Sequence, residues 1–246
     1  MERNAGKITI LFLAVQAVLY VSFLAADLTG TSITLSVSLK FTVIILCFCY
    51  VLFYGNSSGK SILFCMKTAL FFTLVSDLFI LVLDEYYYGV LTFIFAQQLY
   101  GIRLSMEFYD IEKEQEQRLV RKGFLIRLAV QAALLVVICL ILQAAGFVLD
   151  ELLIAGIFYF ISIMTNTLRA IRTAVIRKGS RELVLFAAGI TLFLLCDINV
   201  GLFNMSSYLP LPGELYPAVY GLSSILMWAF YAPSQVLIAL STRDKD

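Results

Sequence analysis

Two acidic residues lie inside long apolar stretches of the sequence, where a carboxylate is costly. Asp77 lies in Ser61–Leu83, about six residues before the end of that stretch. Asp197 lies in Glu182–Asn204, about seven residues before its end. A charge at such a depth in a bilayer usually has a partner and a function. If the two carboxyls meet in a low dielectric, one keeps its proton while the other ionises. One acid and one base at a single site are what general acid–base hydrolysis requires.

The composition is that of a membrane protein. Of 246 residues, 61% are apolar and 14% are charged, and the mean hydropathy is +0.92. Soluble domains have about 45–50% apolar and about 25% charged residues. The net charge of +1 does not indicate a nucleic-acid partner, and the absence of His excludes Ser-His catalysis, His-ligated metals and imidazole proton transfer. The five Cys lie in apolar segments without a CxxC motif, and we expect neither a metal nor a cofactor.

Eight apolar runs of roughly twenty residues predict eight membrane-spanning helices. They are Ile8–Ala26, Ile33–Phe53, Ser61–Leu83, Tyr87–Phe108, Phe124–Phe147, Leu152–Arg172, Glu182–Asn204 and Tyr216–Leu240. Most of the connections are short, and no Pro/Gly-rich linker separates the runs. We therefore expect an all-α, polytopic membrane protein in which residues 1–246 form one bundle and a single domain.

Basic and acidic residues separate to opposite sides of this predicted bundle. The basic side holds Arg3, Lys7, Lys60, Lys113, Arg118, Arg121, Lys122, Arg177, Lys178, Arg181, Arg243 and Lys245, and the other side holds Asp27, Asp84, Glu85, Asp150, Glu151 and Glu214. The positive-inside rule then makes both termini cytoplasmic, in the cytoplasmic (inner) membrane if the source is bacterial. Three further basic residues, Lys67, Arg103 and Arg127, lie near the cytoplasmic helix ends, and we expect their side chains to snorkel to water.

Short sequence matches predict an internal repeat. Leu13-Ala-Val-Gln-Ala17 recurs as Leu128-Ala-Val-Gln-Ala132, and the two aspartates are 120 positions apart, since 197 − 77 = 120. We expect repeats at residues 1–109 and 123–246, joined by a charged cytoplasmic loop at 110–122. Because each repeat has an even number of helices, the halves would run parallel, related by an axis along the membrane normal.

A lysine lies at the same predicted depth as the two aspartates. At about 1.5 Å per residue, Lys40, Asp77 and Asp197 all lie roughly 10 Å below the outer edge of the bundle. A catalytic aspartate pair is one interpretation of this arrangement. Lys40 could instead form an ion pair with either aspartate that only holds helices together, or the charges could serve proton- or ion-coupled transport.

Four further polar residues are candidates for substrate binding. Gln97 and Tyr100 lie on the fourth predicted helix, deeper than the aspartates, and Tyr231 and Gln235 lie one turn apart on the eighth. Amide and phenol groups at such positions also hydrogen-bond neighbouring helices without any further role. Both interpretations stay open for all four residues.

Four segments of the sequence carry a family resemblance. The first two are Phe72-Thr-Leu-Val-Ser-Asp77-Leu and Gly89-Val-Leu-Thr-Phe93-Ile-Phe-Ala96-Gln97-Gln-Leu-Tyr100. The other two are Gly189-Ile-Thr-Leu-Phe193-Leu-Leu-Cys-Asp197 and Tyr231-Ala-Pro-Ser-Gln235. Together they resemble the YhhN-like lysoplasmalogenase family, with its GD-x-x-L helix, its G-x-x-x-F-x-x-x-H-x-x-Y helix, a second aspartate helix and a closing Y-x-x-AQ.

The resemblance implies an integral membrane hydrolase of eight helices. It implies cleavage of the vinyl ether bond of lysoplasmalogens, giving a fatty aldehyde and a glycerophospho-alcohol, with Asp77 and Asp197 as catalytic residues. The sequence departs from the family pattern where Gln97 replaces a common His and where Ser76 and Cys196 precede the aspartates. The first departure could change activity or substrate.

Vinyl ether chemistry suits a paired-carboxyl site. Protonation of the alkene carbon gives an oxocarbenium ion, which water then captures. We expect one aspartate to deliver the proton and the other to stabilise the cation and activate water, with Lys40 tuning the pair or contacting the lipid phosphate. The expected partners are a lysophospholipid and the bilayer, with no nucleic acid, while head-group preference and oligomeric state stay open. The alternatives are a coupled transporter and a non-catalytic family member.

Overall fold

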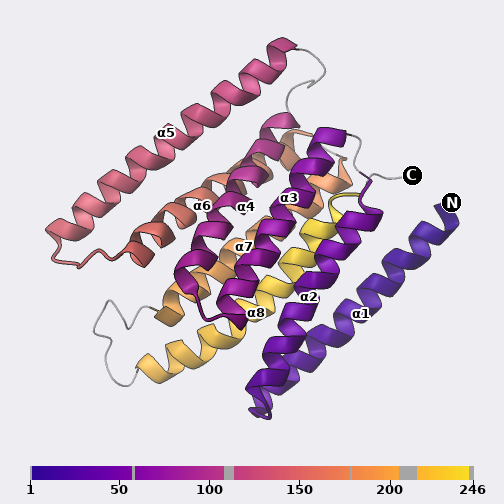
Figure 1. Ribbon diagram of the computed structural model, residues 1–246, viewed down its shortest axis with the longest axis horizontal. Helices are drawn as coiled ribbons and strands as arrows, with labels where there is room; N and C mark the ends of the chain where they lie inside the picture. Colours follow the sequence, from indigo (N-terminus) through magenta and orange to yellow (C-terminus); the bar gives the residue numbers. More distant parts are fainter. Residues whose placement is uncertain (1, 57–58, 108–113, 178, 205–214, 244–246) are drawn as a thin grey trace. The chain divides into compact units, whose positions relative to one another are not determined.

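In the part that the structure describes, the chain folds into helices joined by short connections. The computed structural model describes residues 2–56, 59–107, 114–177, 179–204 and 215–243 (Figure 1). In these residues the helices are α1 (Glu2–Thr29), α2 (Ile33–Tyr54), α3 (Lys60–Asp77), the π-helix η1 (Leu78–Val82), α4 (Tyr86–Met106), α5 (Glu114–Ala144), α6 (Glu151–Ile176), α7 (Arg181–Asn204) and α8 (Leu215–Leu240). The all-α prediction is confirmed, and every predicted span except Ser61–Leu83 coincides with one α-helix, within the described residues.

Local signals in the sequence set the helix boundaries. The Ser32 hydroxyl accepts a hydrogen bond from Leu35 N at 3.2 Å and caps α2, and Asp150 Oδ1 accepts one from Leu153 N at 2.7 Å and caps α6. After α1, Gly30 has a φ of 63°, a left-handed conformation that favours glycine and ends the helix. Short polar side chains and a glycine therefore mark the turns between the apolar runs.

Seven of the helices in the described chain are long and apolar enough to cross a membrane. Helix α4, with 21 residues, is the one α-helix of the described chain that is not among these seven, and it carries Gln97, Gln98 and Arg103 within its length. Its polar residues Gln97, Arg103 and Ser105 are buried, and it contacts α3 on one side and α6 on another. Because neighbouring helices cover these side chains, α4 can lie in the membrane without exposing them to lipid.

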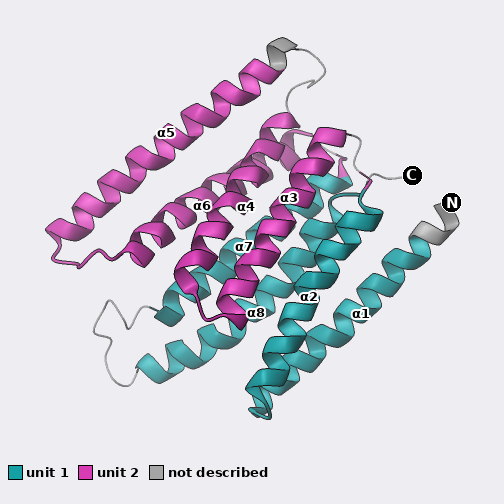
Figure 2. Cartoon of the chain, in the orientation of Figure 1, with its two compact units in different colours: residues 1–55, 181–246 teal, residues 56–180 magenta. Residues whose placement is uncertain are grey.

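The described chain divides into two compact units, which Figure 2 shows in teal and magenta. Unit 1 consists of residues 1–55 and 181–246 and contains α1, α2, α7 and α8; unit 2 consists of residues 56–180 and contains α3, η1, α4, α5 and α6. In unit 1 the contacting pairs of α-helices are α1–α2, α7–α8, α2–α8 and α1–α8, and in unit 2 they are α5–α6, α3–α4, α4–α6 and α4–α5; η1 also contacts α3 and α4. Advancing each α-helix number by four, with the count starting again at α1 after α8, converts the first set of α-helix pairs into the second. The predicted duplication requires such a pattern, although the duplication itself stays a prediction.

Unit 1 is held together by close helix packing and by contacts between its ends. Gln16 Nε2 of α1 donates to Val43 O of α2 at 3.0 Å. Near the two ends of the chain, Arg243 Nη1 donates to the Thr9 hydroxyl. The first and last described helices therefore begin and end at the same end of unit 1, as the predicted eight spans would require. Which side of the membrane this end faces stays a prediction.

Replacing Gly189 with Ala should destabilise unit 1. Gly189 of α7 lies so close to α8 that a Cβ there would be 2.8 Å from Ile238 Cγ1 and 3.0 Å from Ser234 O. Because α8 would have to move, we expect a loss of about 1–3 kcal/mol, measured as a lower Tm in detergent. Gly201 of the same helix has open space at its Cβ, so Gly201→Ala is the matched control and should stabilise slightly. Equal effects of the two changes would contradict this packing.

Two predicted elements differ from the structure. The run Ser61–Leu83 was expected to be one helix, but α3 ends at Asp77 and Leu78–Val82 is π-helical, with Leu83 N donating to Leu78 O at 3.1 Å. No glycine or proline marks this break. The charged segment 110–122 was expected to be a loop; its residues from Glu114 onward form the first turns of α5, and 110–113 lie outside the described residues. The many Glu, Gln and Arg residues of that segment are good helix formers.

Candidate functional site

Asp77 lies at a change in helix geometry. It is 3% exposed and is the last residue of α3, and the π-helical turn begins directly after it. The hydroxyl of Ser76, which precedes Asp77 on α3, donates to Gly89 O on α4. The same oxygen of Gly89 accepts a hydrogen bond from the Thr92 hydroxyl at 2.9 Å. A Cβ at Gly89 would overlap Ile80 of the π-helix, at 2.3 Å from its Cγ1. Glycine at this position therefore lets α4 approach the segment that carries the buried carboxyl. π-helical turns occur frequently at functional sites.

Two predicted site residues of α4 lie in the same unit as Asp77 and are fully buried. Gln97 and Tyr100 both have 0% exposure. Asn166 Nδ2 of α6 donates to Gln97 O at 2.7 Å and to Gln97 Oε1 at 3.1 Å. This pair of bonds holds the Gln97 side chain in one orientation.

Two buried atoms of this amide pair lack a hydrogen-bond partner among the described residues. They are Gln97 Nε2, a donor, and Asn166 Oδ1, an acceptor. An unsatisfied buried polar atom costs about 1–3 kcal/mol, so the pair is suited to bind water or a polar group of a ligand. Asn166 was missed by the sequence analysis. Its signal was present, since an Asn between Thr165 and Thr167 interrupts an apolar span.

Lys40 has a different partner from the two that the sequence suggested. Its Nζ lies 2.9 Å from Oδ2 and 3.1 Å from Oδ1 of Asp27, and the Ser36 hydroxyl also donates to Oδ1. Asp27 was expected in an outer loop, but it lies in the last turn of α1. The alternative of an ion pair between Lys40 and Asp197, which lie in the same compact part of the chain, is therefore corrected in favour of Asp27. The ammonium also lies 4.8 Å from the ring centre of Trp228, a cation–π distance.

Aromatic rings connect this lysine to the second aspartate helix within unit 1. The Trp228 ring lies 5.3 Å from that of Tyr231, and the Tyr231 ring lies 5.2 Å from that of Phe193 on α7. Asp197 follows Phe193 by one helical turn and is half-buried. In unit 1, Trp228 thus lies between Lys40 and Tyr231 and contacts both. The Tyr231 ring packs on Phe193, which lies one helical turn from Asp197. Trp228, the single Trp of the sequence, was missed, although its spacing from Tyr231 places both on one helix face.

Gln235 is fully buried on α8 and lies one turn beyond Tyr231. Its Nε2 donates to the Ser234 hydroxyl at 3.3 Å, while its Oε1 has no hydrogen-bond partner among the described residues. Asn199, two residues after Asp197, donates to Leu195 O at 2.8 Å on its own helix. This bond turns the Asn199 amide back onto its own helix.

The predicted site residues therefore form two groups. Asp77, Gln97 and Tyr100 belong to unit 2, and the other group, Lys40, Asp197, Tyr231 and Gln235, belongs to unit 1. Because the two aspartates are in different units, their pairing stays a prediction. Among the described residues, no group of three or more His, Cys, Asp or Glu could hold a metal ion.

Comparisons with known proteins agree with the resemblance seen in the sequence. The chain matches the YhhN family over residues 35–242, which include both aspartates, Lys40 and every other predicted site residue. No curated protein and no solved structure matches the chain. The chain thus belongs to the YhhN family.

Proposed function

We propose that this protein is an integral membrane hydrolase that cleaves the vinyl ether bond of lysoplasmalogens. Membership of the YhhN family and seven helices suited to cross a membrane support this assignment. The observation that carries it is the environment of Asp77, a carboxyl 3% exposed within an apolar span, at the start of a π-helical turn. A buried carboxyl in the membrane is costly, and the helix irregularity beside it indicates a site kept for function rather than packing.

The proposed reaction needs one proton donor and one proton acceptor. A carboxylic acid protonates the alkene carbon and leaves an oxocarbenium ion on the ether carbon. Water adds to that carbon and gives up a proton to the second carboxylate. The resulting hemiacetal collapses to the fatty aldehyde and the glycerophospho-alcohol. Asp77 and Asp197 are the proposed donor and acceptor, without an assignment of which is which.

The surrounding residues have separate proposed roles. Gln97 Nε2 is the free donor of the buried amide pair and would bind the ether or water oxygen. The Lys40 ammonium, already paired with Asp27, would hold the lipid phosphate at the headgroup level. Tyr100, Tyr231 and Gln235 would contribute hydrogen bonds to the polar part of the substrate, while the apolar helix faces hold its chain.

Release of fatty aldehyde from lysoplasmenylcholine and lysoplasmenylethanolamine by the purified protein tests the proposal. The matched controls are lysophospholipids with a saturated ether or an ester at the same carbon. We expect turnover of the vinyl ethers alone, because the saturated ether has no alkene carbon to protonate. In D2O, protonation at carbon should place one solvent deuterium beside the aldehyde carbon. Fatty acid release from the ester substrate, without aldehyde from the vinyl ether, would contradict the assignment.

A second candidate function is proton- or ion-coupled transport of a small molecule. Two helix irregularities favour it, the π-helical turn after Asp77 and Pro233 inside α8, because transport sites commonly use interrupted helices. Solute flux in proteoliposomes driven by a proton or sodium gradient, without aldehyde release, would support this alternative.

A further inference from the structure

Two arginines from different helices converge on one glycine of α4. The guanidinium of Arg127 on α5 occupies the space where a side chain at Gly101 would lie, since a Cβ there would be 1.7 Å from Arg127 Nη1. Arg169 of α6 donates from Nη1 to Gly101 O at 3.0 Å and from Nη2 to the Ser105 hydroxyl at 2.7 Å. Two positive charges therefore lie against the same residue.

Arg127 does not extend its side chain to water, although the sequence analysis expected it to snorkel. Arg127 Nη2 donates inward to the main-chain and side-chain oxygens of Gln98, both at 3.1 Å. Gln98 is itself held by hydrogen bonds to Gln131 of α5 and Ser162 of α6, both at 3.1 Å. The network joins α4, α5 and α6 and directs the guanidinium into the helix bundle of unit 2.

The charge of this pair is not compensated within the described chain. No carboxylate of the described residues forms an ion pair with Arg127 or Arg169, and Arg127 Nε and Nη1 are buried without a hydrogen-bond partner. The neighbouring Arg103 provides a contrast. It is 1% exposed, so it does not snorkel either, but Glu107 Oε1 lies 3.8 Å from its Nε. Two adjacent like charges in a low dielectric repel each other strongly unless an anion lies between them.

The position of the pair along the helices indicates where such an anion comes from. The apolar run of α5 begins at Phe124, so Arg127 lies about one turn inside the membrane on the side where basic residues gather. This is the level of lipid headgroups. Arg guanidinium groups bind phosphate oxygens through paired hydrogen bonds, and basic pockets between helices on this side of a membrane bind anionic lipid head groups.

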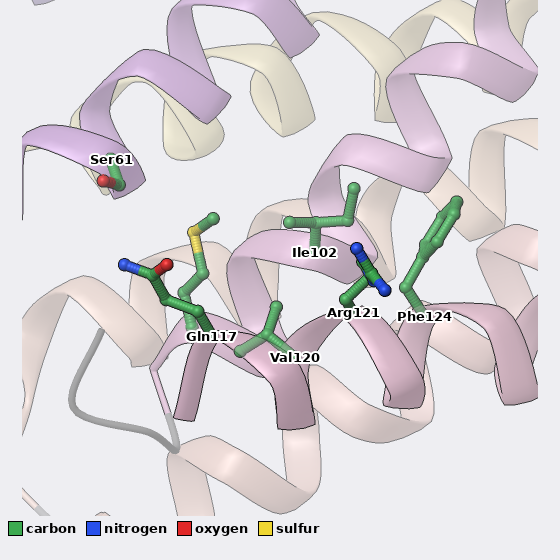
Figure 3. A pocket seen from close by; sticks show the side chains of 7 residues that line it. Ser61, Ile102, Gln117, Val120, Arg121 and Phe124 are labelled. Carbon is green, nitrogen blue, oxygen red and sulfur yellow. The ribbon is translucent and has the colours of Figure 1, made fainter. Parts of the chain in front are cut away.

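A cavity beside the pair offers room for the rest of a lipid. It has a volume of about 370 Å³ and is lined by Ser61 of α3, Ile102 and Met106 of α4, and Gln117, Val120, Arg121 and Phe124 of α5. Figure 3 shows the α5 side chains facing Ile102 and Ser61. Ile102 directly follows Gly101, and the Phe124 ring lies 5.4 Å from the Arg127 guanidinium carbon. The wall of the cavity is mainly apolar, with Arg121 as a further cation.

We propose that Arg127 and Arg169 form a binding site for the phosphate of an anionic phospholipid from the leaflet on the basic side. The lipid phosphate lies beside the guanidinium groups of Arg127 and Arg169 and compensates their charge. An apolar part of the lipid occupies the cavity between α4 and α5. The site uses none of the residues proposed for vinyl ether hydrolysis, so the two proposals can be tested independently.

The test compares lipids of different charge on the purified full-length protein. Tm is measured in neutral detergent alone, with added phosphatidylglycerol, with added phosphatidylcholine and with inorganic phosphate. We expect phosphatidylglycerol to raise Tm by about 5 °C, the effect of a ligand well above its dissociation constant. Phosphatidylcholine and inorganic phosphate should have little effect. An equal shift with inorganic phosphate would overturn a lipid as the occupant, and no shift with phosphatidylglycerol would overturn the site.

Charge-neutralising variants separate this site from a purely structural role. Arg127→Gln and Arg169→Gln should abolish the phosphatidylglycerol shift, which is measured for each variant against its own Tm in detergent alone because each arginine also makes hydrogen bonds to α4. The matched controls Lys122→Gln on α5 and Arg172→Gln on α6, both exposed, should leave the shift intact. Loss of the shift in these two controls as well would assign it to overall charge and overturn the site. A shift that persists in both arginine variants would also overturn it.

Discussion

Asp77→Asn should abolish aldehyde release from lysoplasmenylethanolamine while the protein keeps its fold. Asn has almost the same size and can still hydrogen-bond, but it neither donates a proton to carbon nor accepts one from water. General acid–base groups contribute about 10²–10⁴ in rate, so kcat should fall by at least about 10². Asp197→Asn should cause a loss of similar size, measured under the same conditions with Tm as the check of folding.

The structure provides a matched control for these variants. Asp84, a few residues after Asp77, is exposed and has a φ of 58°, a conformation that Asn tolerates well. Asp84→Asn should therefore leave both Tm and turnover unchanged. If it reduces turnover as much as Asp77→Asn does, the effect cannot be assigned to the buried carboxyl.

The double variant tests whether the two aspartates act together. Residues that form one catalytic unit are not additive, so Asp77→Asn combined with Asp197→Asn should be little slower than either single variant. Multiplied losses would indicate two independent roles. Full activity of Asp197→Asn alone would contradict the pair and leave Asp77 as the only carboxyl of the reaction.

Breaking the ion pair between Lys40 and Asp27 should have the largest effect on stability. Asp27→Asn leaves the Lys40 ammonium uncompensated, with its side chain only 10% exposed. Removing one partner of a buried pair costs about 3–5 kcal/mol. We expect a clear fall in Tm in detergent or nanodiscs, and recovery of most of it in the double variant Asp27→Asn with Lys40→Met. Lys122→Met, at an exposed position of α5, is the control for loss of a lysine.

The same variants distinguish a structural lysine from one that binds substrate. If Lys40 holds the lipid phosphate, the double variant regains stability but keeps a raised KM for lysoplasmalogens. If Lys40 only joins α1 to α2, the double variant regains both stability and the wild-type KM. The second result would remove Lys40 from the proposed substrate site without affecting the roles of Asp77 and Asp197.

The helices and the class of protein follow from the sequence alone. In a membrane each spanning segment must satisfy its own main-chain hydrogen bonds, so an apolar run of roughly twenty residues is nearly sufficient to define a helix. The predicted boundaries therefore coincide with α2 and α7 to within about one residue. Elsewhere, Ser32 and Asp150 side chains cap helix starts, and the left-handed backbone of Gly30 ends α1. Asp77 and Asp197 were also evident, because a carboxylate is conspicuous in an apolar run.

What the sequence did not determine are the contacts between helices. Lys40 pairs with Asp27 because α1 continues past its apolar run, which brings that carboxylate beside α2. Arg127 turns inward because Gly101 leaves room for its guanidinium on α4. Asn166 meets Gln97 only because α6 packs on α4. No local pattern contains these facts, since each depends on which faces of two distant segments pack together.

The break after Asp77 is decided in the same way. The sequence from Ser61 to Leu83 contains no glycine or proline and reads as one regular helix. In the structure, α3 ends at Asp77 and the next turn is π-helical. The Ser76 hydroxyl donates a hydrogen bond to Gly89 O, and Ile80 fills the space beside that glycine. Apolar run length thus determines that this segment crosses the membrane. The shape of the helix at the carboxyl follows from its packing against α4, because the sequence of this apolar run does not mark the turn at which the helix changes.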